Sequence, residues 1–234
     1  MTVFIGQLFV NLMKAIKTFL LLAFIAFVPS FVTAKEDPII IQGIKFTKVT
    51  SSEIMKSSGV WNRIEVQIMA KDNPDDGSKS TWVRNVGVTL TLVYRDEKAV
   101  DKKSPESLIV LQAEAKIFAA EIGKKIPIVF YIPWEAYQTY RLGGEPFAWS
   151  VELSANGTKV PLSKKNLKTM LSKTILKSND PKKAYESYNK LVSGAVKANK
   201  GVLMPLNECP FNVMYYEYYS KGGNNLPIPT YISD

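Results

Sequence analysis

The chain has 234 residues, of which 46% are hydrophobic and 22% charged, with one Cys and no His. This composition is typical of a globular protein, because a disordered chain has fewer apolar residues and a collagen-like chain has far more Gly and Pro. The lack of His excludes Ser-His-Asp and Cys-His nucleophile pairs and His-based metal sites. A single Cys excludes an intrachain disulfide and a multi-Cys metal site.

Residues 1–34 have the pattern of a signal peptide. Two lysines precede an unbroken apolar run of 10 residues, 19–28, and small residues precede the expected cleavage point. A retained membrane anchor is the alternative, but a spanning helix needs about 20 apolar residues. We therefore expect an exported chain of residues 35–234, located in the periplasm, at the outer membrane or outside the cell. Met1 and Met13 both fit as its start codon.

Residues 35–161 are predicted to form a β domain. The segment 38–46 is rich in β-branched residues, and a bulge is expected at Gly43. The segments 61–70 and 81–95 alternate polar and apolar residues, which is typical of strands with one buried face. The residues expected on the buried faces are Ile64, Val66, Ile68, Ala70, Val86, Val88, Leu90, Leu92 and Tyr94.

The segment 104–123 is ambiguous. Its Ser-Pro-Glu start and its final Gly123 suit a helix, but alternation from Leu111 onward favours a strand. We expect a strand that forms a hairpin around Gly123 with the strand 126–132.

The remaining part of the β domain continues this pattern. A short helix is expected over 133–141, then a strand over 147–153. Asn156-Gly157 is the preferred dipeptide for a two-residue hairpin turn into the strand 158–160. Seven short strands with regular turns predict an antiparallel β-sandwich of immunoglobulin-like architecture, although the Cys…Trp…Cys core of antibody domains is missing.

Residues 162–234 are predicted to be a basic helical extension that ends in an aromatic segment. Asp180 is a good N-cap and Pro181 a good first helical residue, so a helix is expected over 181–200. A second helix is expected over 163–177, where a strand is the alternative. The apolar stripe expected on the first of these helices consists of Ala184, Tyr188, Leu191, Ala195 and Ala198.

The positive charge is concentrated in this extension. Without Lys14 and Lys17 of the signal peptide, the net charge falls from +9 to +7, and residues 161–200 alone carry +8. A solvated helix face is one interpretation. Docking onto an anionic surface is the other, with acidic lipid head groups, acidic glycans or another protein as partner. Arg, the favoured reader of bases, is scarce there, so nucleic acid is not expected. The candidate docking residues are Lys164, Lys165, Lys168, Lys182 and Lys183.

Aromatic residues supply a second candidate site. Tyr215, Tyr216, Tyr218 and Tyr219 place Tyr on both faces of any helix or strand, which favours an interface with a partner or a second copy. Cys209 is expected to be a buried thiol, with an intermolecular disulfide as the alternative. The four Trp residues are expected mainly in the core, with sugar stacking as the alternative; they are Trp61, Trp82, Trp134 and Trp149.

No catalytic, metal or cofactor motif is found. The segment 72–77 resembles a calcium loop, but Pro74 and Val83 occupy positions that need oxygen ligands, so a turn is expected. No Gly-rich loop has the Lys-Ser/Thr partner that binds phosphate. A carboxylate pair for glycoside hydrolysis is a minor alternative, and its candidates are Glu135, Glu145 and Glu152.

Several strand-like segments carry a family resemblance. The runs Ala113-Glu114-Ala115 and Gly123-Lys124-Lys125, together with residues 129–133 and 149–153, resemble a group of exported proteins from Verrucomicrobia. In mucin-degrading gut members of the Akkermansia type, such proteins are encoded beside type IV pilus and secretion machinery. The resemblance implies an immunoglobulin-like fold, an envelope or surface location and a pilus-associated or assembly role, and it implies no catalytic residues.

A fibre-subunit role fits less well than an accessory role. Gly6 is followed by Asn11 at the spacing where pilin leaders have Glu, so no pilin leader is expected. We therefore expect a non-enzymatic scaffold or interaction module that contacts envelope or pilus-associated proteins and forms homo-oligomers. The alternative is a carbohydrate-binding module for acidic glycans, and a hydrolase with two carboxylates ranks third.

Overall fold

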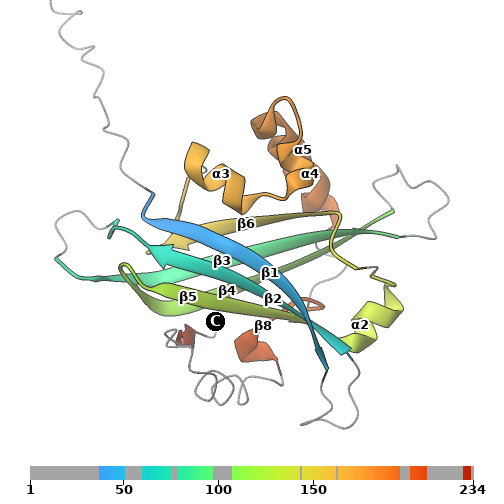
Figure 1. Cartoon of the computed structure of the whole chain (residues 1–234), viewed down its shortest axis with the longest axis horizontal. Helices are drawn as coiled ribbons and strands as arrows, with labels where there is room; N and C mark the ends of the chain where they lie inside the picture. Colours follow the sequence, from blue (N-terminus) through green and yellow to red (C-terminus); the bar gives the residue numbers. More distant parts are fainter. Residues whose placement is uncertain are drawn as a thin grey trace, which may run out of the picture. The chain divides into compact units, whose positions relative to one another are not determined.

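Two antiparallel β-sheets stacked face to face form the body of the protein (Figure 1). The structure is a computed structural model, and it describes residues 37–50, 60–74, 79–96, 107–142, 144–161, 163–195, 201–209 and 229–232. All of these residues belong to one compact unit, Glu36–Asp234. The predicted signal peptide, residues 1–34, lies outside the described residues and stays a prediction.

The first sheet has the strand order β1-β2-β5-β8 and the second has the order β7-β6-β3-β4-β9. The strands of the first sheet are β1 (Ile39–Thr50), β2 (Val60–Ala70), β5 (Lys125–Ile132) and β8 (Met204–Pro205). Those of the second are β7 (Thr158–Lys159), β6 (Ala148–Ala155), β3 (Trp82–Arg95), β4 (Leu108–Glu121) and β9 (Tyr231–Ile232). The seven strands predicted between residues 37 and 161 are confirmed as β1–β7.

The core lies between the sheets and is built from the inward positions of the alternating strands. Ile64, Val66, Ile68 and Ala70 of β2 are all buried, as their alternation predicts. The predicted inward positions of β3, from Val86 to Tyr94, are buried as well. Each large aliphatic side chain contributes roughly 1.5–3 kcal/mol when it is fully buried, so these layers hold the two sheets together.

The bulge predicted at Gly43 of β1 is present, but it lies one residue earlier in the chain. The pairing of β1 with β2 shifts its register between Ile41 and Gly43. Gln42 is therefore the residue that the bulge inserts, and Gly43 resumes the pairing opposite Gln67. Bulges of this kind are common at the edges of sheets.

The segment 104–123 was correctly expected to be a strand, but the expected hairpin around Gly123 is wrong. The strand β4 pairs with β3 and β9 in the second sheet, whereas β5 pairs with β2 and β8 in the first. Gly123, with φ of +82°, therefore carries the chain from one sheet to the other. Alternation shows which side chains of a strand face the core, but it does not show which strand lies beside it.

Two further local predictions are confirmed. The short helix α2 (Trp134–Thr139) follows β5. Asn156 and Gly157, with φ values of +51° and +74°, form the two-residue turn between β6 and β7. Both central residues need positive φ in this type of turn, which Asn and Gly tolerate best.

Between β7 and β8, the residues that the structure describes form the α-helices α3 (Lys164–Met170), α4 (Lys173–Leu176) and α5 (Pro181–Ala195). The single helix predicted over 163–177 is wrong, because the chain becomes extended at Leu171. There it forms a β-bridge with Ser150, and the Ser172 N–H donates to the Trp149 carbonyl at 2.9 Å. Pairing with β6 thus interrupts a helix that local sequence would have continued.

Helix α5 begins where predicted. The Asp180 carboxylate accepts a hydrogen bond from the Lys183 N–H at 3.2 Å, as expected of an N-cap. Of its predicted stripe, Ala184 and Tyr188 are partly buried and pack against the apolar cluster under the helix, whereas Leu191 is 36% exposed. The buried residues are instead Tyr185 and Val192, and the side chains of Ala195 and Ala198 lie outside the described residues. The sheet beneath the helix selects a face that is rotated from the one that the spacing of apolar residues suggested.

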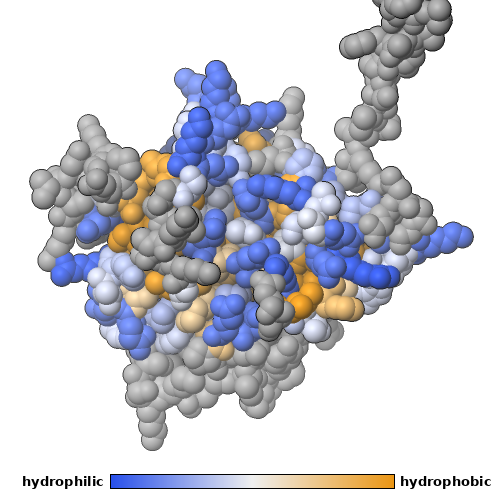
Figure 2. Space-filling view, turned by 180° about the vertical axis from the view of Figure 1, so that it is seen from behind, coloured by the Kyte–Doolittle hydropathy of each residue, from blue (hydrophilic) through white to orange (hydrophobic). Residues whose placement is uncertain are grey.

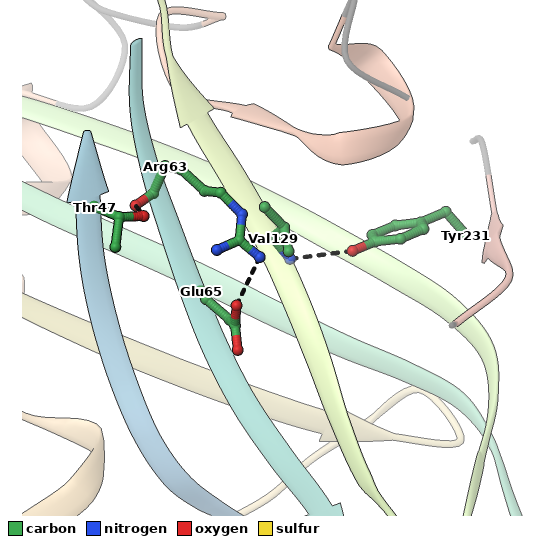
Figure 3. A network of polar contacts seen from close by, with 5 residues as sticks. All are labelled: Thr47, Arg63, Glu65, Val129 and Tyr231. Atoms are coloured by element: carbon green, nitrogen blue, oxygen red, sulfur yellow. Dashed lines mark hydrogen bonds and ion pairs between the residues drawn. The ribbon is translucent and has the colours of Figure 1, made fainter. Parts of the chain in front are cut away.

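Segments from distant parts of the chain close the two open sides of the sandwich. At β1, the Asn166 side chain of α3 donates to the Ile39 carbonyl at 3.2 Å, and the Ser163 hydroxyl donates to the Asp37 carboxylate. On the opposite side, the Tyr231 hydroxyl accepts a hydrogen bond of 3.1 Å from the Val129 N–H of β5 (Figure 3). Strand edges with unpaired backbone groups invite aggregation, so contacts at these edges reduce edge-to-edge pairing.

The outer face of the first sheet carries a smaller apolar cluster. The 3-10 helix η3 (Leu206–Glu208) lies against it, and Arg63 and Glu65 of β2 form an ion pair of 2.6 Å on the same face (Figure 3). Cys209 is buried in this cluster, which confirms the expectation of a buried thiol. Residues 201–232 contribute a strand to each sheet, and the predicted boundary between residues 161 and 162 stays a prediction.

Candidate functional site

The outer face of the second sheet is divided between a half covered by helices and a half that no other described helix or strand covers. Helices α3–α5 lie over β6 and its neighbours (Figure 1). They bury outward-facing side chains of the sheet, and the resulting cluster consists of Val93, Val110, Ala148, Leu171, Ile175, Tyr185 and Val192. This cover explains why Thr91 and Val93, on the face of β3 opposite the core, are nevertheless buried.

The open half of the same face forms a groove of about 570 Å³. Two rows of paired residues cross it. Glu152, Thr89 and Glu114 form one row over β6, β3 and β4, and Ser154, Gly87 and Lys116 form the next. Lys159 of β7 and Ile232 of β9 line its ends. The groove is therefore floored by a sheet and lined mainly by polar side chains.

The lack of a side chain at Gly87 lets two neighbouring side chains close over the backbone of β3. A Cβ atom at this position would lie 2.4 Å from Ser154 Oγ and 3.0 Å from Glu114 Oε1. These two oxygens therefore converge on the space above the Gly87 backbone. A larger residue here would fill that space and push the Ser154 side chain aside.

Glu152 lies at the boundary between the helices and the groove. Its Oε1 accepts a hydrogen bond of 2.7 Å from the Tyr185 hydroxyl, and its Oε2 is 2.8 Å from Lys159 Nζ. Partial burial would raise the pKa of Glu152, but the hydrogen bonds from Lys159 and Tyr185 stabilise the carboxylate more, so its pKa is lowered. Glu152 is thus an ionised acceptor, which suits binding better than general-acid chemistry.

Two tyrosines of α5 connect the helix to β6. Burial, together with the hydrogen bond to Glu152, raises the pKa of Tyr185. Burial also raises the pKa of Tyr188 to about 12, and its hydroxyl accepts a hydrogen bond of 3.2 Å from Ser150 Oγ. Both phenols therefore stay neutral at physiological pH and act as hydrogen-bonding groups.

The pairing of β3 with β4 is interrupted at one position, and an exposed aromatic side chain lies there. Asn85 has φ of +46°, a conformation that Asn tolerates better than most residues. Asn85 is skipped in the pairing of β3 with β4, and Val83 and Val86 on either side of it both point into the core. Phe118, skipped in the same place on β4, is 62% exposed.

The lysines of the helical region form a basic face. Hydrophilic side chains stand out on this side of the molecule (Figure 2). The side chains of Lys164 and Lys165 of α3 lie outside the described residues. The exposed lysines of the region are Lys168, Lys173, Lys177, Lys182, Lys183 and Lys190. Three of the five lysines predicted to dock are therefore placed at the surface, and the structure adds Lys173, Lys177 and Lys190.

The structure describes the candidate Trp residues but not the candidate Tyr cluster. Tyr215, Tyr216, Tyr218 and Tyr219 lie outside the described residues, so their interface stays a prediction. Of the four Trp residues, three fill or border the core clusters: Trp61 is buried, and Trp134 and Trp149 are half-buried. Trp82, at the start of β3, is 48% exposed.

The three carboxylates that were candidates for hydrolysis lie in different parts of the molecule. Glu135 is exposed on α2, which contacts β2 of the first sheet, and Glu145 is exposed in the loop before β6. Glu152 lies in the groove. Glu114, which is paired across Thr89 from Glu152, was missed as a partner because only strand pairing brings β4 and β6 to either side of β3.

Two features are absent from the described part of the chain. No group of three Asp, Glu or Cys side chains is placed there as a metal site would require. None of the helices described is long and apolar enough to cross a membrane.

Comparison with known proteins identifies no family for this chain. No protein-family model matches the chain, and no curated protein matches it. Among solved structures, a crystal structure of a protein from Akkermansia muciniphila is similar, with 14% sequence identity and a TM-score of 0.49. The similarity covers 84% of this chain and 93% of that one.

Proposed function

We propose that this chain is an exported, non-enzymatic interaction module of the cell envelope that docks its basic helical face onto an acidic partner protein. The observation that carries the proposal is the set of exposed lysines on α3–α5. These helices are packed onto the sandwich through a buried cluster, so the lysines are presented from a fixed platform. Preorganised charge of this kind favours partner recognition and speeds association.

The balance of charge on these helices supports an acidic partner. Within the described residues 163–195, only Asp180 and Glu186 are acidic, and both are exposed. Lys183 lies 3.8 Å from Asp180, but both side chains are more than half exposed, so this contact contributes little. The surface therefore keeps a large positive excess that a negatively charged partner would neutralise.

An immunoglobulin-like architecture is part of the proposal, and the strand order supports it. Strands β1-β2-β5 correspond to strands A, B and E of an immunoglobulin sandwich. Strands β7-β6-β3-β4 correspond to G, F, C and C′ of the opposite sheet. Sandwiches of this kind are frequent in cell-surface domains. The association with pilus or secretion machinery rests on the sequence resemblance alone.

Cross-linking in native cells, followed by mass spectrometry, tests the proposal. The test variant carries Lys→Gln at Lys168, Lys173, Lys182 and Lys183. The matched control carries the same change at four exposed lysines on or beside β1, β2 and β5, namely Lys45, Lys48, Lys71 and Lys124.

Recovery of a pilus or secretion component by the wild type and the control, but not by the test variant, is the expected result. An unchanged set of partners in the test variant would contradict docking by the basic face. Recovery of only the chain itself would replace the scaffold role with self-assembly.

A further inference from the structure

The groove on the second sheet has a chemistry different from that of the basic face. Two carboxylates and two ammonium groups line it: Glu114 with Lys116, whose charged atoms are 4.0 Å apart, and Glu152 with Lys159 at 2.8 Å. Their charges sum to zero. A ligand with a large net charge therefore gains little from this groove, whereas a ligand that both donates and accepts hydrogen bonds matches it.

The floor provides a specific hydrogen-bonding position. Ser154 Oγ and Glu114 Oε1 lie close together over the Gly87 backbone, where a Cβ would be 2.4 Å and 3.0 Å from them. A ligand hydroxyl placed above these two oxygens would donate to the carboxylate and exchange a hydrogen bond with the serine. Carboxylate acceptors form stronger hydrogen bonds than neutral ones, so this position is suited to a ligand hydroxyl.

An exposed aromatic ring lies on the same face of β4 as two residues of the groove. Glu114, Lys116 and Phe118 are alternate residues of β4, so their side chains project from the same face. Glu114 and Lys116 line the groove, and Phe118 is 62% exposed. Asn85, which also lines the groove, is the residue of β3 skipped opposite Phe118. An exposed ring beside polar groups offers a stacking surface for the apolar C–H face of a sugar.

We propose that the groove is a binding site for a neutral saccharide, which stacks on Phe118 and donates hydroxyl hydrogen bonds to Glu114 and Glu152. A volume of about 570 Å³ lies within the range of small-molecule sites. Ser154 and Thr89 supply further hydroxyls, and Lys116 and Lys159 donate to ring and hydroxyl oxygens. This site is independent of the basic face, and its charge balance selects neutral rather than acidic sugars.

Isothermal titration calorimetry on the purified protein tests the site. The probes are the neutral disaccharides lactose, maltose and N,N′-diacetylchitobiose, with 3′-sialyllactose and the zwitterionic peptide tri-alanine as comparators. We expect at least one neutral disaccharide to bind with a Kd tenfold or more below that of either comparator. The absence of binding by all three neutral disaccharides at millimolar concentrations would overturn the proposal, as would tighter binding of the acidic sugar or the peptide.

Three variants place the binding in the groove. Glu114→Gln, Phe118→Ala and Gly87→Ala should each raise the Kd at least tenfold. They replace a carboxylate acceptor by a neutral amide, remove the stacking ring and displace the Ser154 side chain, respectively. Glu135→Gln, at an exposed position of α2, is the control and should leave the Kd unchanged. Circular dichroism melting identifies any variant that fails to fold, and the others decide the result. Binding that all folded groove variants retain would exclude this site.

Discussion

The Tyr185 hydroxyl donates a hydrogen bond of 2.7 Å to Oε1 of Glu152. Tyr185 belongs to the helical cluster on the second sheet, and Glu152 lines the groove on the same face. This contact therefore marks the boundary between the part of the sheet that stabilises the fold and the part that we propose to bind a ligand. It also sets the charge state of Glu152, because the donated proton favours the carboxylate.

Removal of this hydrogen bond should destabilise the protein without disturbing its packing. In Tyr185→Phe the buried ring stays and only the hydroxyl is lost. A hydrogen bond to a charged group contributes roughly 1.5–3 kcal/mol, and partial exposure of Glu152 reduces this, so we expect a loss of about 1 kcal/mol in the free energy of unfolding. Urea denaturation measures it. Tyr140→Phe, at a half-buried position after α2, is the control, and an equal loss there would refute a specific role for Tyr185.

The stability contributed by Glu152 should depend on pH in the acidic range. Its pKa is lower in the folded state than the ordinary value of 4.5. The ionised group therefore stabilises the fold above pH 4.5, and this stabilisation is lost as the pH falls through the lower, folded-state pKa. Glu152→Gln should be less stable than the wild type at pH 7, and the difference should shrink below pH 4.5.

Urea denaturation of both proteins at pH 7 and pH 3 measures this difference. The variant Glu135→Gln should match the wild type at both pH values. A gap between wild type and Glu152→Gln that is equal at pH 7 and pH 3 would show that the effect is not electrostatic.

The hydrogen bond between Val129 and Tyr231 should protect the edge of β5. In Tyr231→Phe the Val129 N–H loses its acceptor at 3.1 Å, so its amide should exchange with solvent faster. A backbone donor left without a partner costs about 1–3 kcal/mol if it stays buried. Hydrogen exchange measured by NMR tests this, with the Val66 amide in the middle of the first sheet as internal control. Unchanged exchange at Val129 would mean that another group covers this edge.

Two glycines should respond in opposite ways to substitution by alanine. Gly123 has φ of +82°, and a Cβ there would meet nothing within 4 Å, so Gly123→Ala tests backbone strain alone. We expect it to destabilise the fold by about 1–2 kcal/mol. Gly43 has equal space and no positive φ, so Gly43→Ala should be neutral or stabilise by up to about 1 kcal/mol. Thermal melting of both variants compares them, and equal destabilisation would argue against strain at the link between the sheets.

Local patterns predicted the strands well and the helices less well. The alternation in β2 and β3 identified their buried residues, because the side chains of a strand alternate strictly between its two faces. The N-cap at Asp180 was also predictable, because capping depends only on residues next to it in the sequence. The interruption of the helix at Leu171 was not predictable, because it depends on pairing with Ser150, which lies 21 residues earlier in the chain. The buried face of α5 was also misjudged, since the sheet beneath it decides which apolar residues are covered.

The groove was also not predictable from local sequence patterns. Its residues are ordinary polar positions of three strands, and Glu152 was noticed only as one of several acidic residues near aromatics. Its relation to Glu114 follows from the order β6-β3-β4, in which β6 enters the sheet between β3 and the hairpin strand β7. Strand order is a property of distant pairing, and no spacing in the sequence encodes it.

The sequence by itself determined that this protein is mainly β, that seven strands precede a basic helical region, and that His-dependent and multi-Cys chemistry are excluded. These conclusions depend on composition and on short-range periodicity, which the backbone geometry of strands and helices imposes locally. Only the tertiary structure decided which strands share a sheet, which half of the second sheet stays open, and where Glu114, Glu152 and Phe118 lie relative to one another. Those relations arise from packing between residues far apart in the chain, where burial of apolar surface outweighs local preference.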